Sequence, residues 1–455
     1  MKKVLYTLIT FTLFLTACQK DEDPLILNKA ASSYSHRIPL TWNQLYLEVE
    51  RFTPGYRPPV AARNNAYINL MAYEAAVHGS EGRYNSFSGV FTDLELDQPE
   101  ANREYNWEVC VNAAYEKGFE LFFPIAPSEQ QFQILDVAQS LRGNLQTLTE
   151  PDVYRRSVEY GQYIAETIYA WSTLDEWGHE AYLKNEDPAF QPIVGLGTWQ
   201  PTYPDFAPAL LPHWGKVRTF AARPSDVAAS PLPYSTDPNS LLYQEAMEVK
   251  TLVDEIKNGD HPEQKWIAEF WSDDCPILTF TPAGRWTSIG NQLIGIERLN
   301  MMETVAFYAK LGMALSDAGV KCWAEKYKFN CLRPIDYIRA NQNDPTWNTI
   351  MCPDGSGGYF TPNFPAYPSG HATFGAAASV VFDETFGQNY RFTDRSHEGR
   401  TEFDGRPRTF TTFRAMAIEN GESRIPLGVH FRSDSDAGLD LGFVIGARVT
   451  NLPWR

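Results

Sequence analysis

Three short patches in the last third of the chain carry side chains that bind oxyanions. Each places cationic or hydrogen-bond-donating groups near the end of an expected helix, and the patches read Lys326-(six residues)-Arg333-Pro334, Pro368-Ser369-Gly370-His371 and Ser423-Arg424-(five residues)-His430-(three residues)-Asp434. Lys326, Arg333 and Arg424 are fixed positive charges. The Ser369 hydroxyl and the Gly370 amide are neutral donors at a helix N-terminus. Together the patches predict a cradle for a tetrahedral, phosphate-like anion.

Two histidines add acid–base and ligand chemistry to this cradle. Asp434 follows His430 by four residues, so a helix that begins there lets the carboxylate accept the Nδ1 proton of His430. Nε2 of His430 is then free to act as a ligand or as a nucleophile. His371 reaches the same anion from another side, and we expect it to be the general acid or base.

Each patch also has an ordinary structural explanation. Basic residues near Pro334 occur in surface loops, Ser-Gly-His is a common helix cap, and an Arg–His–Asp run is usually a salt-bridge cluster. Three such patches in this order and at these spacings argue against coincidence.

The patches resemble the signature shared by type-2 phosphatidic acid phosphatases, bacterial non-specific acid phosphatases and vanadium-dependent haloperoxidases. That signature reads Lys-x6-Arg-Pro, Pro-Ser-Gly-His and Ser-Arg-x5-His-x3-Asp, and this chain meets every defining position. The resemblance implies an all-α fold built on two helical bundles, with the anion site in the core of the second.

The residues around the central patch resemble the haloperoxidase branch. The segment from Phe364 to Gly375 looks like the vanadium chloroperoxidase version of the motif, with Phe364 where algal bromoperoxidases carry a histidine. Trp271 and Trp323 resemble pocket tryptophans of the same family. Trp271, Trp323 and Phe364 are therefore the expected halide pocket, although aromatic residues at such spacings more often pack in a core.

An acidic residue after Trp271 completes the expected site. In the haloperoxidases such an acid orients the acid–base histidine. By position Asp274 is the better candidate in this chain, and Asp273 is the weaker one.

The resemblance implies a vanadate cofactor, one per chain. His430 would be the direct metal ligand through Nε2, Asp434 would orient it, and the oxygens would be held by Lys326, Arg333, Ser369, Gly370 and Arg424. His371 would assist the exchange of peroxide, and Lys326 would polarise the bound peroxide. The implied substrates are hydrogen peroxide and a halide, with iodide expected first and bromide second, and the product is hypohalous acid.

Two other classes of function remain open. The same residues could make the protein an acid phosphatase, with His430 as nucleophile and His371 as leaving-group acid, because vanadate mimics phosphoryl transfer. The protein could also be a binding lipoprotein with a relic site. An integral lipid phosphatase is disfavoured because no segment after the first residues is apolar enough to span a bilayer.

The elements that must position these residues are mostly helical. Apolar residues recur at three-and-four spacing over 61–78, 103–122, 129–148, 152–171, 240–257, 261–271, 292–323, 370–386, 411–420 and 434–449. Prolines cluster between Asp187 and Pro233, which predicts a long irregular surface excursion. We therefore expect an N-terminal helical lobe over 51–240 that includes this excursion, and a C-terminal lobe over 241–455 that carries the site. The stretch 394–400 is expected to be a solvated surface loop.

Composition narrows the partners. The 455 residues include 39 Lys+Arg and 56 Asp+Glu, so the formal charge is 39 − 56 = −17. A nucleic-acid partner is therefore not expected. Cysteine appears at positions 18, 110, 275, 322, 331 and 352, and the five after Cys18 are an odd number, so at least one stays unpaired within the chain. The sequence does not fix the pairing or the oligomeric state.

The N-terminus resembles an export signal. Lys2 and Lys3 precede an apolar run, which predicts a signal peptide over 1–17. Leu15-Thr16-Ala17-Cys18 looks like a bacterial lipobox, so Cys18 would be lipidated and would attach the protein to a membrane. We expect an outer-membrane lipoprotein that faces the periplasm or the cell surface, with residues 18–50 as its tether.

Overall fold

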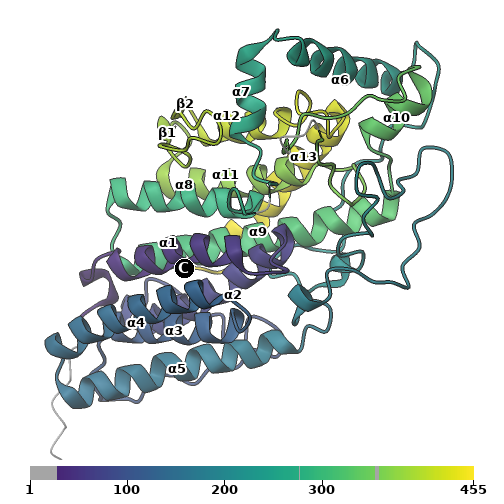
Figure 1. Cartoon of the computed structure of the whole chain (residues 1–455). Coiled ribbons are helices and arrows are strands. Elements are labelled where there is room, and N and C mark those ends of the chain that lie inside the picture. The colour runs from purple at the N-terminus through teal and green to yellow at the C-terminus, as the bar shows by residue number, and fades with distance from the viewer. Residues whose placement is uncertain (1–27, 276, 354–357) are drawn as a thin grey trace, which may run out of the picture.

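The computed structural model describes residues 28–275, 277–353 and 358–455 and is mostly helical, as Figure 1 shows. This confirms the all-α expectation. The strands of the described part, β1 (Phe392–Asp394) and β2 (Arg408–Phe410), form one short antiparallel pair in which Thr393 faces Thr409. The signal peptide and Cys18 lie outside the described residues. Within those residues, no helix is both long and apolar enough to cross a membrane.

The N-terminal half is a stack of five helices, drawn in the lower part of Figure 1. They are α1 (Arg37–Phe52), α2 (Pro58–Val77), α3 (Trp107–Phe122), α4 (Ser128–Leu148) and α5 (Pro151–Thr173). Nearly every residue of α2 is buried. A helix that is buried all round lies at the centre of a bundle.

The C-terminal half holds the remaining helices. They are α6 (Leu241–Lys257), α7 (Pro262–Phe270), α8 (Pro282–Glu297), α9 (Met301–Phe329), α10 (Pro334–Asn341), α11 (Gly370–Phe386), α12 (Phe413–Glu422) and α13 (Arg432–Thr450). α9 runs through the middle of the molecule, with α2 on one side and α11 and α13 on the other (Figure 1).

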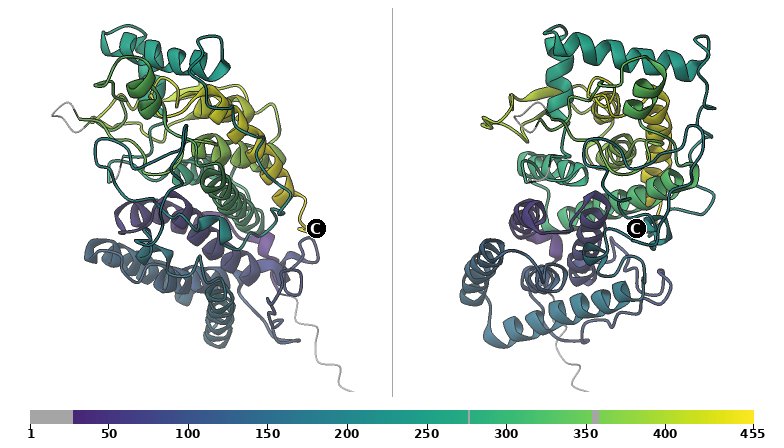
Figure 2. Two further views of the ribbon diagram at one scale, coloured as in Figure 1. Left: turned by 90° about the vertical axis from the view of Figure 1, so that its right-hand side faces the viewer. Right: turned by 45° about the vertical axis from the view of Figure 1, so that its right-hand side comes forward.

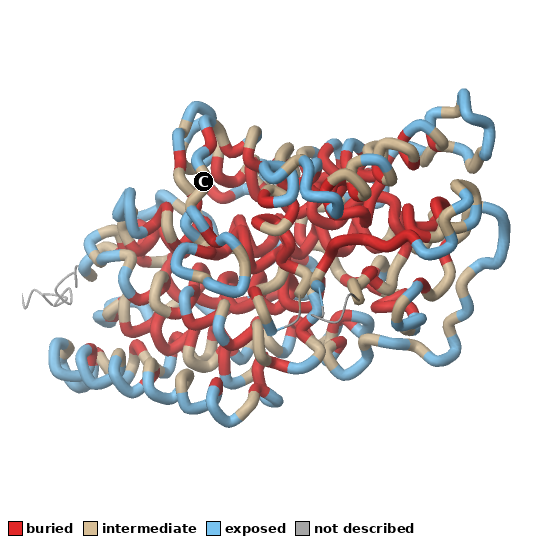
Figure 3. The backbone as a smooth tube through the Cα atoms, turned by 45° about the horizontal axis from the view of Figure 1, so that its top comes forward, coloured by how far each residue is buried: buried red, intermediate tan, exposed pale blue. Residues whose placement is uncertain are grey.

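One apolar core joins the two halves. Its buried residues run from Ala31 to Trp454 and include both faces of α9, and Figure 3 shows this buried interior as a continuous band. α2 and α9 touch at the backbone, because a Cβ added at Gly312 would lie 2.7 Å from the Cα of Ala66. A smaller apolar cluster lies under α6 and α10. The expected boundary near residue 240 therefore does not separate two independent cores.

α11 and α13 approach each other closely through glycines of α13. A Cβ added at Gly438, Gly442 or Gly446 would lie 2.6, 2.3 or 2.6 Å from a backbone oxygen of Ser369, Thr373 or Ala377, respectively. A side chain at any of these positions would push the helices apart. The glycine spacing thus sets the distance between the N-terminus of α11 and that of α13.

The tether expected over 18–50 is wrong for its second half. Residues 37–50 belong to α1, and its apolar face packs into the core through Trp42, Tyr46 and Val49. The indole of Trp42 also donates a hydrogen bond to Asn112 Oδ1 at 3.0 Å. These buried residues follow the three-and-four spacing of a helix, which is the signal that sequence analysis overlooked.

The single helical stretch expected over 292–323 is also wrong. α8 ends at Glu297, its C-cap Arg298 has a left-handed φ of 53°, and α9 begins after Asn300. Asn300 and Glu303 form a reciprocal capping box. The Asn-x-x-Glu pattern predicts this helix start and could have located the break.

The proline-rich excursion is irregular, as expected, apart from a 3-10 turn at Trp214–Lys216 and one at Ala181–Leu183 just before it. It runs along the side of the helices toward α6 (Figure 2). It is not only a surface segment, since Trp199 and Trp214 are buried. The Asp317 carboxylate on α9 accepts hydrogen bonds at 2.7 Å from the amides of residues 220–222 and so fixes this part of the excursion.

The expected solvated loop at 394–400 is wrong at two positions. Asp394 and His397 are buried. His397 Nε2 lies 3.1 Å from Asp273 Oδ1, and Arg285 Nε lies 3.6 Å from Asp273 and 3.5 Å from Asp394. This buried cluster fastens the loop to the segment that follows α7.

Candidate active site

The three patches converge because each lies at a helix end in the C-terminal half. Lys326 is in the last turn of α9, Arg333 precedes α10, Ser369 caps α11, and His430 stands just before α13. Arg424 follows α12. All five side chains are buried. The structure therefore brings together the residues that the patches predicted as an anion cradle.

Lys326 is held by the loop in front of α11. Its Nζ donates hydrogen bonds to the carbonyl oxygens of Pro365, Ala366 and Pro368 at 2.9, 2.8 and 2.6 Å. Burial lowers the pKa of this ammonium to about 8. The three carbonyls fix the charge in place, and a nearby anion would favour the charged form again.

Arg333 links this loop to the third patch. Its Nε donates to Phe364 O at 3.0 Å, and its Nη1 donates to Val429 O at 2.9 Å. Nη1 also lies 3.3 Å from Nε2 of His430, while Nη2 is buried without a hydrogen-bond partner in the described part of the chain. Burial lowers the pKa of Arg333 to about 10, so the side chain stays charged at neutral pH.

Ser369 and Gly370 form the N-terminus of α11. The Ser369 hydroxyl accepts the Ala372 amide at 3.5 Å, and the Ser369 amide donates to Asp434 O at 2.8 Å, which ties α11 to α13. The Gly370 backbone lines a cavity together with His371. The amides of this helix start offer donors to an anion.

The ring of His430 is oriented from both sides. Nδ1 lies 3.0 Å from Asp434 Oδ2, an oxygen that also accepts the Phe431 amide at 3.0 Å. Burial lowers the pKa of His430 well below its usual value. Arg333 Nη1 can only donate, so its contact with Nε2 places the lone pair of the neutral ring on Nε2 and the proton on Nδ1, which donates to the Asp434 carboxyl, whose pKa burial raises to about 7.

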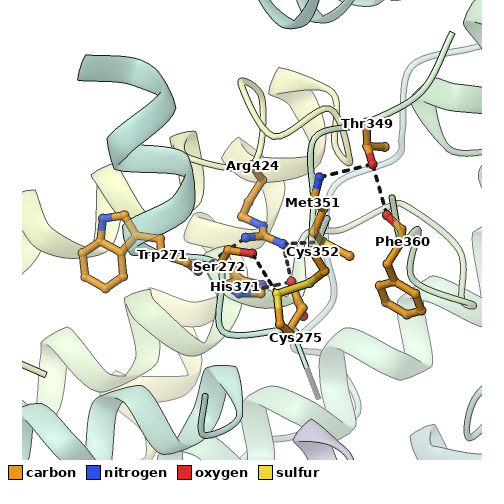
Figure 4. The surroundings of a disulfide bond; sticks show 10 residues. Trp271, Ser272, Cys275, Thr349, Met351, Cys352, Phe360, His371 and Arg424 are labelled. Atoms are coloured by element: carbon orange, nitrogen blue, oxygen red, sulfur yellow. Dashed lines mark hydrogen bonds and ion pairs between the residues drawn. A yellow bond between two sulfur atoms is a disulfide. The ribbon is translucent and has the colours of Figure 1, made fainter. Parts of the chain in front are cut away.

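Asp274 connects His371 and Arg424, both of which are labelled in Figure 4. Asp274 Oδ2 accepts a hydrogen bond from Arg424 Nη2 and lies 3.7 Å from Nε2 of His371. Burial lowers the pKa of His371 to about 4, so its ring is neutral at pH 5 to 8. The structure places Asp274, and not Asp273, beside His371, because Asp273 is held by His397 and Arg285 instead.

A small cavity of about 20 Å³ opens at this cluster. Its lining comprises Pro58, Asp274, Pro282, Trp323, Pro362, Phe364, Gly370, His371, Phe374, Arg424 and His430. A larger cavity of about 410 Å³ shares Pro58, Asp274, Pro282, Pro362 and Phe364 with it and lies toward α1. The larger space is the route by which small molecules would reach the cluster.

The expected halide pocket is only partly placed at this cavity. Trp323 and Phe364 line it, with ring centroids 5.0 Å apart. Trp271 does not, because it stacks on Trp286 and donates its indole N–H to Glu419 Oε1 at 2.9 Å. Aromatic spacing carries no information about which way a ring points, so sequence analysis could not separate these cases.

The prolines and Phe374 of the lining were not among the residues predicted for the site. Phe374 is one helical turn after His371 on α11, so its position was readable once that helix was placed. Pro58 and Pro282 are remote in sequence from the three patches. No local signal connects them to the site.

The cluster suits an oxyanion. Arg333 Nη2, Arg424 Nε and His371 Nε2 are buried polar atoms without hydrogen-bond partners among the described residues. Unpaired buried donors are costly unless something binds them. An anion with several acceptor oxygens, held opposite His430 Nε2, would satisfy the two arginine donors, and a protonated oxygen of a bound molecule would satisfy His371 Nε2. Among the described residues, no group of three or more His, Cys, Asp or Glu is placed to hold a metal ion.

Comparisons with known proteins point to one family. The profile of the VCPO second helical-bundle domain matches residues 306–453, the region of the three patches. Vanadium chloroperoxidase of Curvularia inaequalis is 26% identical over 220 residues, which span 38% of this chain and only 36% of that enzyme.

Solved structures extend the likeness to the whole chain. A bacterial vanadium-dependent iodoperoxidase has a TM-score of 0.75 and 29% identity, and the alignment covers 94% of this chain and 97% of that one. The holo form of a bacterial vanadium-dependent chloroperoxidase has a TM-score of 0.64 at 14% identity, covering 88% and 92%. The second likeness concerns the fold alone.

Proposed function

This chain belongs to the vanadium haloperoxidase family, and we propose that it oxidises a halide with hydrogen peroxide at the site between α9, α11 and α13. The observation that carries the proposal is the pair of buried, unpaired donors on Arg333 and Arg424, together with the unpaired Nε2 of His371, at the cluster that holds Nε2 of His430. These groups fit vanadate, a metal oxyanion that needs several donors and one ligand. When bound, vanadate would supply a Lewis acid that activates peroxide toward a halide without changing its own oxidation state.

The cationic residues would hold the cofactor's oxygens. Lys326, Arg333 and Arg424 carry the charges, while Ser369 and the Gly370 amide donate neutral hydrogen bonds. His430 would be the metal ligand through Nε2, because Asp434 keeps the proton on Nδ1. The fixed charges are preorganised, so little reorganisation is needed during the reaction.

His371 would move the proton of the incoming peroxide. Its neutral ring has a free Nε2, and an imidazole of this kind accepts a proton from a hydrogen peroxide molecule in the cavity. Asp274 lies 3.7 Å away and would stabilise the imidazolium that results. Lys326 would polarise the peroxide through its charge, because its three N–H groups already donate to the carbonyl oxygens of Pro365, Ala366 and Pro368.

We propose iodide as the preferred halide and bromide as the second. The cavity walls formed by Trp323, Phe364 and Phe374 are apolar, and the prolines of the lining have no N–H to donate. A halide that enters must lose water without gaining hydrogen bonds from these walls. Iodide loses its water most easily among the three halides.

We also propose that the protein is exported and anchored. Residues 1–17 would be a signal peptide, and lipidated Cys18 would hold the protein in the outer membrane, facing the periplasm or the cell surface. The change Cys18→Ala is expected to move the protein from the membrane to the soluble fraction.

The test of the activity uses the chain from Gln19 onward. We expect hydrogen peroxide to oxidise iodide to triiodide only after orthovanadate has been added, with slower bromide oxidation and negligible hydrolysis of a chromogenic phosphate ester. Ester hydrolysis that vanadate inhibits, without any halide oxidation, would contradict the proposal and would make the protein a phosphatase with His430 as nucleophile.

A further inference from the structure

A disulfide bond lies immediately behind the residues that hold Arg424. Cys275 and Cys352 are 77 positions apart in sequence, and their Cα atoms are 5.5 Å apart. Cys275 lies in the loop after α7, and Cys352 lies in the loop between α10 and α11. The bond therefore joins two loops from different parts of the chain, as Figure 4 shows.

The residue before each cysteine contacts the same nitrogen of Arg424. Nη2 of Arg424 donates to the carboxylate of Asp274 and lies 3.5 Å from Sδ of Met351. Nη1 of Arg424 lies 3.4 Å from the carbonyl oxygen of Trp271. The guanidinium is thus gripped between the loop that carries Cys275 and the loop that carries Cys352.

Other bonds fix each loop separately. Leu278 and Thr279 donate backbone hydrogen bonds to Cys275 O at 3.2 and 3.4 Å, and Phe360 donates to Met351 O at 3.0 Å. Between residues 272–275 and 349–352 no hydrogen bond is present among the described atoms. The disulfide is the direct link between the two loops, and Arg424 bridges them noncovalently.

We propose that the Cys275–Cys352 disulfide is a positioning element of the anion site, which holds Asp274 and Met351 on Arg424 and, through Asp274, supports His371. A carboxylate that orients two groups must be placed to within a fraction of an ångström. Without the bond, the two loops move independently and Asp274 spends less time on Arg424 and His371. The inference rests on the proposed function only for the identity of the anion.

The first test compares the wild type with Cys275→Ser/Cys352→Ser. Orthovanadate binding is measured by calorimetry without peroxide or halide, and folding is measured by thermal melting. We expect about tenfold weaker vanadate binding, as for other losses around metal ligands, together with a lower melting temperature. A lower melting temperature with unchanged vanadate affinity would show a purely structural disulfide and would overturn the proposal.

A double-mutant cycle tests the route through Asp274. In an Asp274→Asn background the grip on Arg424 is already weakened, so loss of the disulfide should reduce vanadate affinity by less than twofold. The change Cys110→Ala, at a buried cysteine of α3 far from the site, is the matched control and should bind vanadate as the wild type does. Full additivity of Asp274→Asn and the cysteine changes would contradict a route through Asp274.

Reduction of the wild type covers the case in which the double variant does not fold. A phosphine cleaves the S–S bond by giving up two electrons, and water supplies the oxygen of the resulting phosphine oxide and the two protons of the two thiols. After anaerobic removal of the phosphine and confirmation of folding by circular dichroism, weaker vanadate binding that reoxidation restores is expected. Unchanged binding by the folded, reduced protein would refute the proposal.

These readouts separate the inference from the proposed function. If vanadate binds and its affinity depends on the disulfide, the inference holds even when no halide is oxidised. If halide oxidation is found, but the KM for peroxide and the vanadate affinity are the same with and without the disulfide, the proposed function stands and the inference fails.

Discussion

His430 and His371 have opposite surroundings although both line the same cavity. The ring of His430 is held at both nitrogens, by Asp434 on one side and Arg333 on the other. Nε2 of His371 has no hydrogen-bond partner in the described chain. A fixed ring suits a ligand, whereas a ring with a free nitrogen suits proton transfer.

This difference predicts that replacing His430 and replacing His371 impair different properties, namely vanadate binding and the rate of iodide oxidation. His430→Ala should abolish vanadate binding, and with it the rise in melting temperature that vanadate gives the wild type. That rise corresponds to about 2.7 kcal/mol at a hundredfold excess over Kd. His371→Ala should keep most of the rise and lose at least about 100-fold in iodide oxidation. His179→Ala, remote from the site, serves as control, and equal vanadate retention in the first two variants would contradict the assigned roles.

The sequence predicted the polar residues of the site better than the apolar ones. Lys326, Arg333 and Arg424 lie at helix ends. Their order and spacing in the sequence indicate an anion-binding site, because few other kinds of site require cationic residues in that pattern. Trp271 was assigned to the halide pocket and packs in the core instead, since a ring's direction depends on tertiary contacts. Pro282 was missed because only the fold brings it to the cavity.

At the scale of elements, the contact between α11 and α13 sets the geometry of the site. Ser369 and His371 begin α11, while His430 and Asp434 stand at the start of α13. A Cβ at Gly442 would lie 2.3 Å from Thr373 O. Because this oxygen belongs to the backbone of α11, the clash could be relieved only by moving one of the two helices. Helix spacing, and not side-chain reach, therefore decides whether the two histidines face one anion.

Gly442→Ala should separate the two helices. We expect a loss of about 1–3 kcal/mol in unfolding free energy and weaker vanadate binding. Gly295→Ala is the matched control, because this exposed glycine of α8 has nothing within 4 Å of an added Cβ. The control should be neutral or stabilise the protein by up to about 1 kcal/mol. Equal unfolding free energies of Gly442→Ala and Gly295→Ala in denaturant would rule out the close contact between α11 and α13.

The joint between α1 and α8 predicts a dependence of stability on pH. Glu50 of α1 is buried and accepts hydrogen bonds from the Thr281 amide at 2.9 Å and the Thr281 hydroxyl at 3.0 and 3.1 Å. Burial raises its pKa to about 8, whereas the unfolded value is about 4.3. The native state thus holds the proton more tightly, and stability falls as pH rises through this window.

Glu50→Gln removes that titration and keeps the shape of the side chain. The variant should match the wild type near pH 5 and exceed its unfolding free energy by about 1–3 kcal/mol at pH 8. Guanidinium unfolding at the two pH values measures the difference. Glu48→Gln, on the exposed side of the same helix, should show the same small effect at both pH values. A benefit of Glu50→Gln that does not grow with pH would contradict the assignment.

α1 and the break between α8 and α9 show what limited the prediction of elements. The start of the chain was treated as a tether because its composition is polar, yet Trp42, Tyr46 and Val49 follow helical spacing. Apolar periodicity also ran across Arg298 without interruption. Helix caps mark such ends more reliably than apolar residues do, because they satisfy specific backbone groups.

At the scale of the whole molecule, the two halves depend on each other. α9 belongs to the C-terminal half but packs against α2 at backbone contact through Gly312. The apolar core is continuous across the expected boundary. Only the order of the helices, and not the sharing of one core, could be inferred from the sequence.

The fragment 241–455 should therefore not fold alone, although it carries every signature residue. Without α2 the apolar face of α9 is exposed to water. The fragment then loses roughly 25 cal/mol of stabilising free energy for each Å² of apolar surface that α2 covers. We expect no cooperative thermal transition by circular dichroism and no vanadate binding. The chain from Gln19 to Arg455, prepared in parallel, should give one cooperative transition. A sharp melting curve for the fragment would show that the second half is an independent domain.

The burial of the cysteine and methionine sulfur atoms bears on how well the protein would resist oxidation by the hypohalous acid that we propose it makes. Hypohalous acid attacks thiols and thioethers, and attack follows exposure and thiolate character. Cys110 and Cys322 are fully buried and Cys331 is half-buried, and burial raises the pKa of all three thiols, that of Cys331 to about 12. Among the described methionines only Met247 is not fully buried. If the proposed oxidation takes place, the number of turnovers before inactivation would thus depend on the packing of atoms that take no part in catalysis.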